Sequence, residues 1–251
     1  MNYILFSKNE LFREGAEKIK IEAQKQNKQC EVLEIHSITK NGILRQKIDN
    51  TSLVYFLTND VCIPEYIELL KKKGAYIVNE APLSGDLKKY ILQNKVKNNG
   101  VRVPKNICLS SDKETGRLNL KYPVYIKSQK QGSLVIYNLN PDELNKNIIS
   151  IGNINEFYFE EAVEIKGFVL RKFYYIKEVI IDMDKKNTDP VPDWLYIVLK
   201  NISLSLKLEV FSSDIFVNWS SQEYFCIDIN PASSFFKSEK ARKEFVRNIL
   251  I

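Results

Sequence analysis

Short apolar runs alternate with amphipathic segments over the first eighty residues, and this alternation restricts the fold more than any other feature. Two of the runs, Tyr3–Phe6 and Leu53–Thr58, are almost entirely apolar, which is typical of strands covered on both faces of a parallel sheet. The sequence therefore predicts a small parallel α/β lobe over residues 1–83. Its expected strands are Tyr3–Phe6, Cys30–Ile35, Leu53–Thr58 and Tyr76–Val78, and its expected helices cover Leu11–Ala23 and Pro64–Lys73.

The rest of the chain mixes helices with strands that follow one another directly, so the predicted class is α/β with an α+β second part. Strand-like segments dominate from Phe157 onward, and two of them near the C-terminus are joined by a short polar stretch. The expected helices start at Ser84, Pro141, Asp193 and Ser238, and the expected strands include Tyr122–Lys127, Ser133–Tyr137, Glu209–Asn218 and Tyr224–Ile229.

The composition excludes several classes of protein. No two of the nine glycines are separated by a single residue and none precedes a lysine, so the chain lacks both the GxGxxG dinucleotide motif and a P-loop. A single histidine, His36, excludes HExxH zinc sites and disfavours a Ser-His or Cys-His catalytic pair. The four cysteines are far apart, as expected of free thiols in a reducing compartment.

We expect a cytoplasmic protein with neither a membrane nor a nucleic-acid partner. The first residues lack the basic and apolar regions of a signal peptide, and no stretch approaches the ~20 apolar residues of a membrane span. The chain has 37 Lys and Arg against 31 Asp and Glu. This excess of +6 is small, and aromatic residues do not alternate with basic ones as they do in nucleic-acid binding surfaces.

The segment SSDIFVNWSSQEYFCIDINPASSF carries the most chemical information. Asp228 and Asn230 lie two residues apart on an expected strand, so both side chains project from one face. A connection formed by Trp219–Glu223 would place Asp214 opposite Asp228 on that face, whereas an even-numbered connection would turn Asp214 away. Two carboxylates and an amide oxygen suit Mg²⁺, which prefers oxygen ligands. The alternative is that these acids end strands and cap turns.

This segment resembles the terminal metal signature of the ATP-grasp superfamily. That superfamily includes glutathione synthetase, D-alanine–D-alanine ligase, the ribosomal-protein glutamate ligases and the inositol-tetrakisphosphate kinases. Most of the ligases carry Asp…Glu-x-Asn, whereas the form found here, Asp228-Ile229-Asn230, occurs particularly in the inositol phosphate kinases. The resemblance extends from about Tyr76 to Phe236. It implies an ATP-grasp domain over residues 84–251, in which two α+β subdomains, 84–162 and 163–251, sandwich ATP.

Two further segments are similar to the family's phosphate-binding elements. LKKYILQNKVKNNG resembles the entry helix, which implies that Lys89 contacts phosphate, and YPVYIKS resembles the strand whose lysine contacts the α- and β-phosphates, which implies the same role for Lys127. QGSLVIYN resembles the loop that closes over the phosphates, which implies that Gly132 and Ser133 bind there.

The segment FYFEEAVEIKGFVLRKFYYI resembles the adenine hinge and the strand that follows it. The resemblance implies that backbone groups of the hinge hold the base, and that Arg171 and Lys127 act on the transferring phosphoryl group. Downstream of Arg171 the chain is shorter than in typical peptide-type ligases, and the Arg and Asn of their acceptor site have no clear counterpart. The hinge residues are Glu160, Glu161, Ala162 and Val163.

The leading hypothesis is an ATP-dependent carboxylate–amine ligase that acts on an amino acid or a peptide through an acyl phosphate. Its implied cofactors are ATP and two Mg²⁺ ions held by Asp214, Asp228 and Asn230. One alternative is a small-molecule kinase of the inositol phosphate type, favoured by the Asp-Ile-Asn sequence and the basic segment 71–105. The other is a degenerate module that binds nucleotide without turnover, favoured by the glycine-poor loop. Since many relatives are dimers, the resemblance also allows a homodimer.

Overall fold

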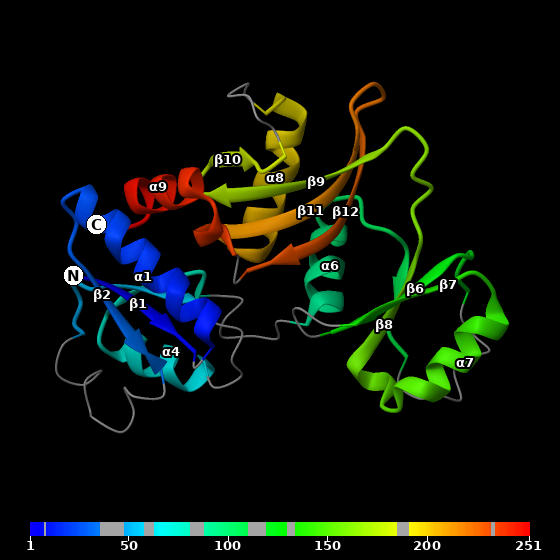
Figure 1. Cartoon of the computed structure of the whole chain (residues 1–251), viewed down its shortest axis with the longest axis horizontal. Helices are drawn as coiled ribbons and strands as arrows, with labels where there is room; N and C mark the ends of the chain where they lie inside the picture. Colours follow the sequence, from blue (N-terminus) through cyan, green and yellow to red (C-terminus); the bar gives the residue numbers. More distant parts are fainter. Residues whose placement is uncertain are drawn as a thin grey trace. The chain divides into compact units, whose positions relative to one another are not determined.

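The computed structural model describes residues 1–7, 9–35, 48–57, 63–80, 88–109, 119–129, 134–184, 191–231 and 234–251. The chain forms two compact units, and Figure 1 labels the helices and strands. Unit 1 comprises Met1–Asp86, Lys172–Ser213 and Asn230–Ile251, and unit 2 comprises Leu87–Arg171 and Asp214–Ile229. The limits of the units fall inside three strands, which are β9 (Val169–Ile176), β11 (Val210–Asn218) and β12 (Glu223–Asn230).

Each unit therefore gathers segments that are distant in the sequence. The units do not coincide with the contiguous lobes 1–83, 84–162 and 163–251 expected from the sequence, and those lobes stay a prediction. Patterns along a chain reveal elements, whereas the packing of late elements onto early ones depends on tertiary contacts.

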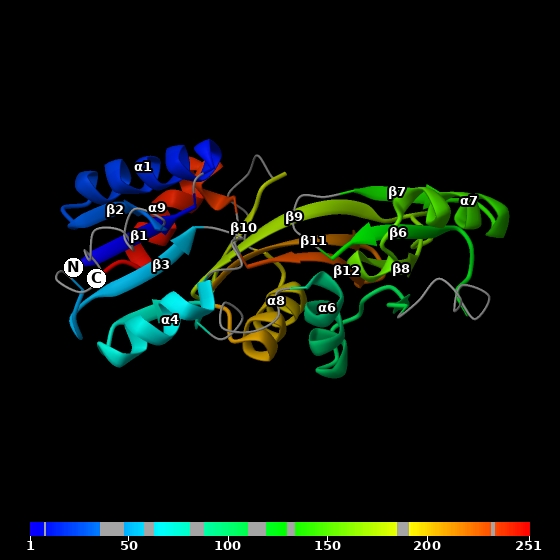
Figure 2. The ribbon, with the colours of Figure 1, turned by 90° about the horizontal axis from the view of Figure 1, so that it is seen from below.

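Unit 1 contains the parallel sheet that the sequence predicts. The strand order is β2-β1-β3-β4, and every neighbouring pair is parallel. Every residue of β1 and β3 is buried, as expected for strands with helices on both faces. Helices α1 and α4 lie on opposite faces of this sheet (Figure 2). The elements are β1 (Asn2–Phe6), α1 (Glu10–Lys25), β2 (Cys30–Glu34), β3 (Leu53–Leu57), α4 (Ile63–Lys72) and β4 (Tyr76–Val78).

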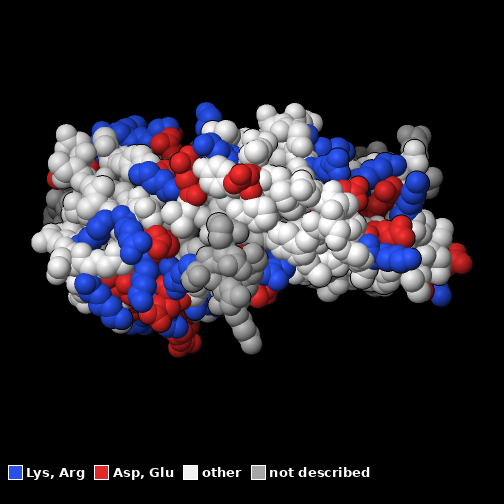
Figure 3. Space-filling view, turned by 90° about the horizontal axis from the view of Figure 1, so that it is seen from above, with Lys and Arg blue, Asp and Glu red and all other residues white. Residues whose placement is uncertain are grey.

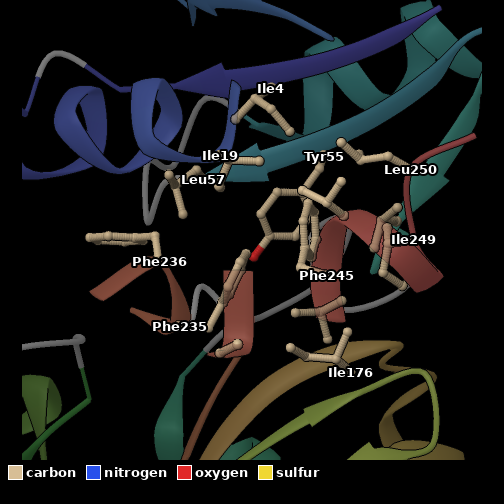
Figure 4. Packing of buried hydrophobic residues seen from close by; sticks show 14 of the residues in the cluster. Ile4, Ile19, Tyr55, Leu57, Ile176, Phe235, Phe236, Phe245, Ile249 and Leu250 are labelled. Carbon is tan, nitrogen blue, oxygen red and sulfur yellow. The ribbon is translucent and has the colours of Figure 1, made fainter. Parts of the chain in front are cut away.

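Residues from the end of the chain complete the core of this sheet. The ring of Tyr55 on β3 lies 5.9 Å from that of Phe235 and 4.9 Å from that of Phe245, measured between centroids (Figure 4). Phe235 belongs to the short helix η3 (Phe235–Lys237) and Phe245 to α9 (Glu239–Asn248). A Cβ atom on Gly15 of α1 would lie 2.7 Å from Cγ of Phe236, so only glycine lets the helix approach this closely.

A second sheet has the strand order β10-β9-β11-β12. In unit 1 the hairpin of β9 and β10 (Val179–Asp182) turns at Lys177 and Glu178, which both have positive φ, as a two-residue hairpin turn requires. Helix α8 (Asp193–Leu206) begins at the expected residue, and Lys207 ends it in a left-handed conformation. The buried Asn79 accepts hydrogen bonds from the backbone N–H groups of Glu209 (2.8 Å) and Val210 (3.0 Å) and so ties the end of β4 to β11.

Unit 2 contains an antiparallel sheet of order β5-β8-β6-β7. Helix α7 packs Leu144 and Ile148 against Val124, Ile126 and Phe159 on one face of this sheet. Side chains alternate along a strand, so the neighbouring residues of β6 and β8 project from the opposite face. The elements of unit 2 are α6 (Lys89–Asn98), β5 (Asn106–Ile107), β6 (Val124–Ser128), β7 (Val135–Asn138), α7 (Pro141–Ile151), η2 (Ile154–Glu156) and β8 (Phe157–Glu161).

A side-chain cap explains where helix α7 of unit 2 begins. The Asn140 side chain accepts from the N–H of Glu143 (3.0 Å), and the Glu143 carboxylate accepts from the N–H of Leu139 (2.7 Å), so that α7 starts with a reciprocal cap. Among the described residues α6 begins at Lys89, and Ser84, the expected start, lies outside them.

Candidate functional site

A cavity of about 340 Å³ lies in unit 2, on the face of β6 and β8 that does not pack against α7. This volume falls in the range of small-molecule sites. Strands β11 and β12 and helix α6 also contribute to its wall. The polar residues that line the cavity are Lys89, Lys127, Ser128, Tyr158, Glu160, Asp214 and Asp228.

Two ion pairs dominate the charge in this cavity. Lys89 Nζ lies 2.9 Å from Asp228 Oδ1, and the two side chains are 17% and 27% exposed. Lys127 Nζ pairs with Glu160 Oε1 where the side chains are only 13% and 2% exposed. Attraction between charges grows as water is excluded. Two ammonium groups from α6 and β6 thus face two carboxylates from β12 and β8, and Asp214 of β11 adds a third carboxylate to the lining.

Glu160 is held by partners on both carboxylate oxygens. Oε1 accepts from Lys127 Nζ, and Oε2 accepts from Gln93 Nε2 at 3.1 Å. Burial raises the pKa of the Glu160 carboxyl, whereas the Lys127 ammonium and the Gln93 amide oppose that rise. The sequence did not single out Gln93, although it lies one helical turn after Lys89 and thus on the same face of α6.

The structure brings Asp214 and Asp228 to the same cavity. Strand β12 starts at Glu223, so the connection from β11 is Trp219–Gln222, one residue shorter than the expected one. This shorter connection has an even number of residues, and Asp214 and Asp228 both line the cavity, so the face of β11 from which Asp214 projects stays a prediction.

These residues have the chemistry of a magnesium site. Asp214 and Asp228 supply carboxylates, and Asn230 lies two residues beyond Asp228 on β12. Among the described residues the Asn230 Oδ1 atom has no hydrogen-bond partner although it is buried, and such an atom is costly unless something binds it. A hard, oxygen-seeking cation prefers carboxylate and amide oxygens, so the chemistry of the three expected ligands suits Mg²⁺. No cluster of three or more His, Cys, Asp or Glu side chains suited to a metal exists in the described part of the chain.

The remaining wall of the cavity is apolar. Tyr125 packs its ring against Tyr137 with centroids 5.0 Å apart, and Phe216 and Ile227 come from β11 and β12. Leu134, Val135 and Leu170 also line the cavity and are 52%, 56% and 52% exposed. Large apolar side chains left in contact with solvent around a cavity mark a site for a flat or apolar ligand group.

The hinge residues divide between two cavities. Glu160 lines the cavity described above, Glu161 and Ala162 line a second one of about 470 Å³, and Val163 lines both. The N–H of Glu161 donates to Lys105 O (2.9 Å) and the N–H of Ala162 donates to Pro123 O (2.8 Å). These two N–H groups are therefore already used within the protein, and a ligand at the hinge would have to bind other backbone groups.

Four other expected site residues are not placed at the cavity, and the first is Asn230, which does not line it, so its role as a metal ligand stays a prediction. Among the described residues, Leu170 lines it and the neighbouring Arg171 does not, so the role of Arg171 stays a prediction. Gly132 and Ser133 lie outside the described residues.

On the face shown in Figure 3, Lys and Arg are interspersed with Asp and Glu. Among the described helices, none combines the length and the apolar character needed to cross a bilayer.

Comparison with known proteins shows the fold. No family model matches the chain, and no curated protein matches it in sequence. The ADP complex of purK, N5-carboxyaminoimidazole ribonucleotide synthetase, matches with a TM-score of 0.72 at 13% identity, covering 99% of this chain and 76% of that one. D-alanine–D-alanine ligase from Bacillus anthracis, complexed with ATP, matches with a TM-score of 0.72 at 12% identity, covering 99% and 95%.

A third match is the ATP-grasp ligase PsnB, complexed with a precursor peptide and AMPPNP. Its TM-score is 0.71 at 12% identity, and the match covers 98% of this chain and 95% of that one. The chain has the ATP-grasp fold, as the resemblance in its sequence predicts.

Proposed function

We propose that this protein is an ATP- and Mg²⁺-dependent carboxylate–amine ligase whose substrate is an amino acid or a peptide. The observation that carries the proposal is the cavity of unit 2, where two lysines, three acids and an apolar wall meet within an ATP-grasp fold. Ammonium groups neutralise phosphate charge, and an apolar wall accepts a purine ring. The phosphates and the base of a nucleoside triphosphate thus have matching groups in one cavity.

The chain's own residues would position the nucleotide. Phosphoryl transfer needs positioning and charge stabilisation more than covalent help from the protein. Lys89 and Lys127 would exchange their carboxylate partners, Asp228 and Glu160, for phosphate oxygens, while Tyr125 would cover the base. Asp214, Asp228 and Asn230 would hold Mg²⁺, which when bound neutralises charge on the phosphates.

The proposed reaction has two steps. A substrate carboxylate oxygen forms a bond to the γ-phosphorus while the bond from that phosphorus to the β,γ-bridging oxygen breaks, which gives an acyl phosphate and ADP. An amine then attacks the acyl carbon, inorganic phosphate leaves, and the amine proton passes to solvent. Activation is needed because a free carboxylate is a poor electrophile. PsnB is complexed with a precursor peptide in the matched structure, which supports including peptides among the substrates to test.

Trapping the acyl phosphate tests the proposal directly. Purified protein is incubated with MgATP, hydroxylamine and pooled amino acids or peptides, and ADP and hydroxamate are measured. We expect hydroxamate to form, and at about 100 times the dissociation constant MgATP should raise the melting temperature by roughly 5–10 °C. Asp228→Ala should abolish both effects, whereas Lys95→Met, on an exposed part of α6, should change neither.

The remaining outcomes separate the alternatives. ADP release with a stable phosphorylated alcohol and no hydroxamate would identify a kinase. A melting shift without ADP release across the whole panel would identify a nucleotide-binding module. A wild-type protein whose melting temperature is unchanged at millimolar MgATP would overturn the proposal.

A further inference from the structure

One buried amide joins two of the strands that carry charged groups of the cavity. Gln93 is 1% exposed, and its Nε2 donates to Glu160 Oε2 on β8 (3.1 Å) and to the carbonyl oxygen of Ile227 on β12 (3.0 Å). Asn106 Nδ2 donates to Gln93 Oε1 at 2.8 Å. This last bond fixes the orientation of the amide, so that its donor side faces Glu160.

Gln93 and Lys127 share the same two acceptors. Lys127 Nζ also donates to Glu160 and, at 3.4 Å, to the Ile227 carbonyl. A neutral amide and a charged ammonium thus both donate to the same buried carboxylate and the same carbonyl. Each hydrogen bond that Gln93 donates to these acceptors is one that the ammonium of Lys127 does not have to supply.

We propose that Gln93 is a positioning residue that keeps the ammonium of Lys127 available to a bound phosphate by satisfying part of the Glu160 carboxylate and the Ile227 carbonyl. The proposal rests on the proposed nucleotide-binding function of the cavity and adds to it a residue that acts only through another. Hydrogen bonds to a charged acceptor are strong. Without the amide, Glu160 and Ile227 would draw the ammonium toward themselves and away from the cavity.

The substitution Gln93→Met removes both donated bonds and nearly preserves the length of the side chain. We expect the dissociation constant for ATP to rise roughly tenfold, while that for adenosine, which lacks phosphates, changes less than about twofold. A merely structural role would weaken both ligands together. Asn94→Met is the matched control, because the Asn94 side chain donates to the Tyr90 carbonyl (2.9 Å) on the same helix.

A thermodynamic cycle tests whether Gln93 acts through Glu160. In a Glu160→Gln background the carboxylate charge is gone, so Gln93→Met should change ATP affinity by less than about twofold. Equal effects of Gln93→Met in both backgrounds would contradict the proposal.

A measurement without nucleotide keeps this inference separate from the proposed function. The acetylation rate of Lys127 is measured by mass spectrometry, with the exposed Lys95 as an internal reference. We expect the rate at Lys127 to fall at least about threefold in Gln93→Met and to rise in Glu160→Gln. If the acetylation rates changed in this way in a protein that binds no ATP, the positioning role would be supported and the proposed function would be overturned. Unchanged rates at Lys127 in both variants would overturn the positioning role.

Discussion

Lys89 Nζ lies 2.9 Å from Asp228 Oδ1, so the lysine expected to bind phosphate is the counter-ion of the acid expected to bind metal. The pair is mostly shielded from solvent, with side chains 17% and 27% exposed, and its attraction is weakened by screening less than that of a surface pair. The ammonium therefore competes with any cation for the carboxylate.

The first prediction concerns this competition. Lys89→Met should tighten the binding of Mg²⁺ alone, because Asp228 loses its positive partner, and should weaken the binding of metal-free ADP, because a phosphate contact is lost. We expect changes of roughly three- to tenfold in opposite directions. Calorimetric titration with MgCl₂, and separately with ADP in a chelator, measures both. Lys95→Met is the control, and a Lys89→Met protein in which both affinities fall would refute the competition.

The second prediction uses the raised pKa of Glu160. Lys127 opposes the effect of burial, so Lys127→Met should raise the pKa of Glu160 further. A carboxyl whose pKa is higher in the folded state than in the unfolded state stabilises the fold at low pH, and that stability is lost as pH rises through the folded pKa. The stability deficit of Lys127→Met relative to wild type should therefore grow between pH 5 and pH 8.

Urea unfolding at four pH values across this range measures that deficit. Its slope with pH cannot exceed about 1.4 kcal/mol per unit for one group. The double variant Lys127→Met with Glu160→Gln has no carboxyl at this position, so its deficit relative to Glu160→Gln alone should be independent of pH. If the stability deficit of Lys127→Met alone were the same at every pH, the titration of Glu160 would not be coupled to folding.

The third prediction concerns Tyr55 in the core of unit 1. Its hydroxyl is buried and has no hydrogen-bond partner among the described residues, whereas its ring packs against Phe235 and Phe245. Tyr55→Phe should raise the free energy of unfolding by about 1 kcal/mol, since an unsatisfied polar group is removed. Tyr55→Ala should lower it by about 3–5 kcal/mol through loss of the ring. Chemical denaturation compares the two, and a destabilised Tyr55→Phe would show that the hydroxyl is satisfied in solution.

Much of the fold could be predicted because its signals are local. The apolar runs at β1 and β3, the proline at the start of α7 and the acid spacing near β12 all act over a few residues. Asp214 and Asp228 could be expected to lie close together because a short connection joins the two adjacent strands that carry them. The resemblance to the ATP-grasp superfamily then predicted the fold that the structural comparisons show.

What could not be predicted depends on contacts between distant segments. Gln93 was missed because an uncharged residue on a lysine-rich helix gives no sign of the carboxylate that it meets 67 positions later. Pairing of both lysines with acids was also missed, since the resemblance describes a nucleotide-bound site, whereas here each lysine is paired with an acid of the protein itself. The Phe236 ring, in turn, explains why α1 carries a glycine at position 15.

The packing of Phe235 and Phe245 against Tyr55 has a consequence for synthesis of the protein. During translation the strands β1 and β3 leave the ribosome long before α9, and at 5–20 residues per second the interval is roughly ten to forty seconds. Over that time the apolar face of the nascent sheet lacks its final cover. Newly made chains of this protein should therefore bind chaperones that recognise exposed apolar strands, and release should follow completion of α9.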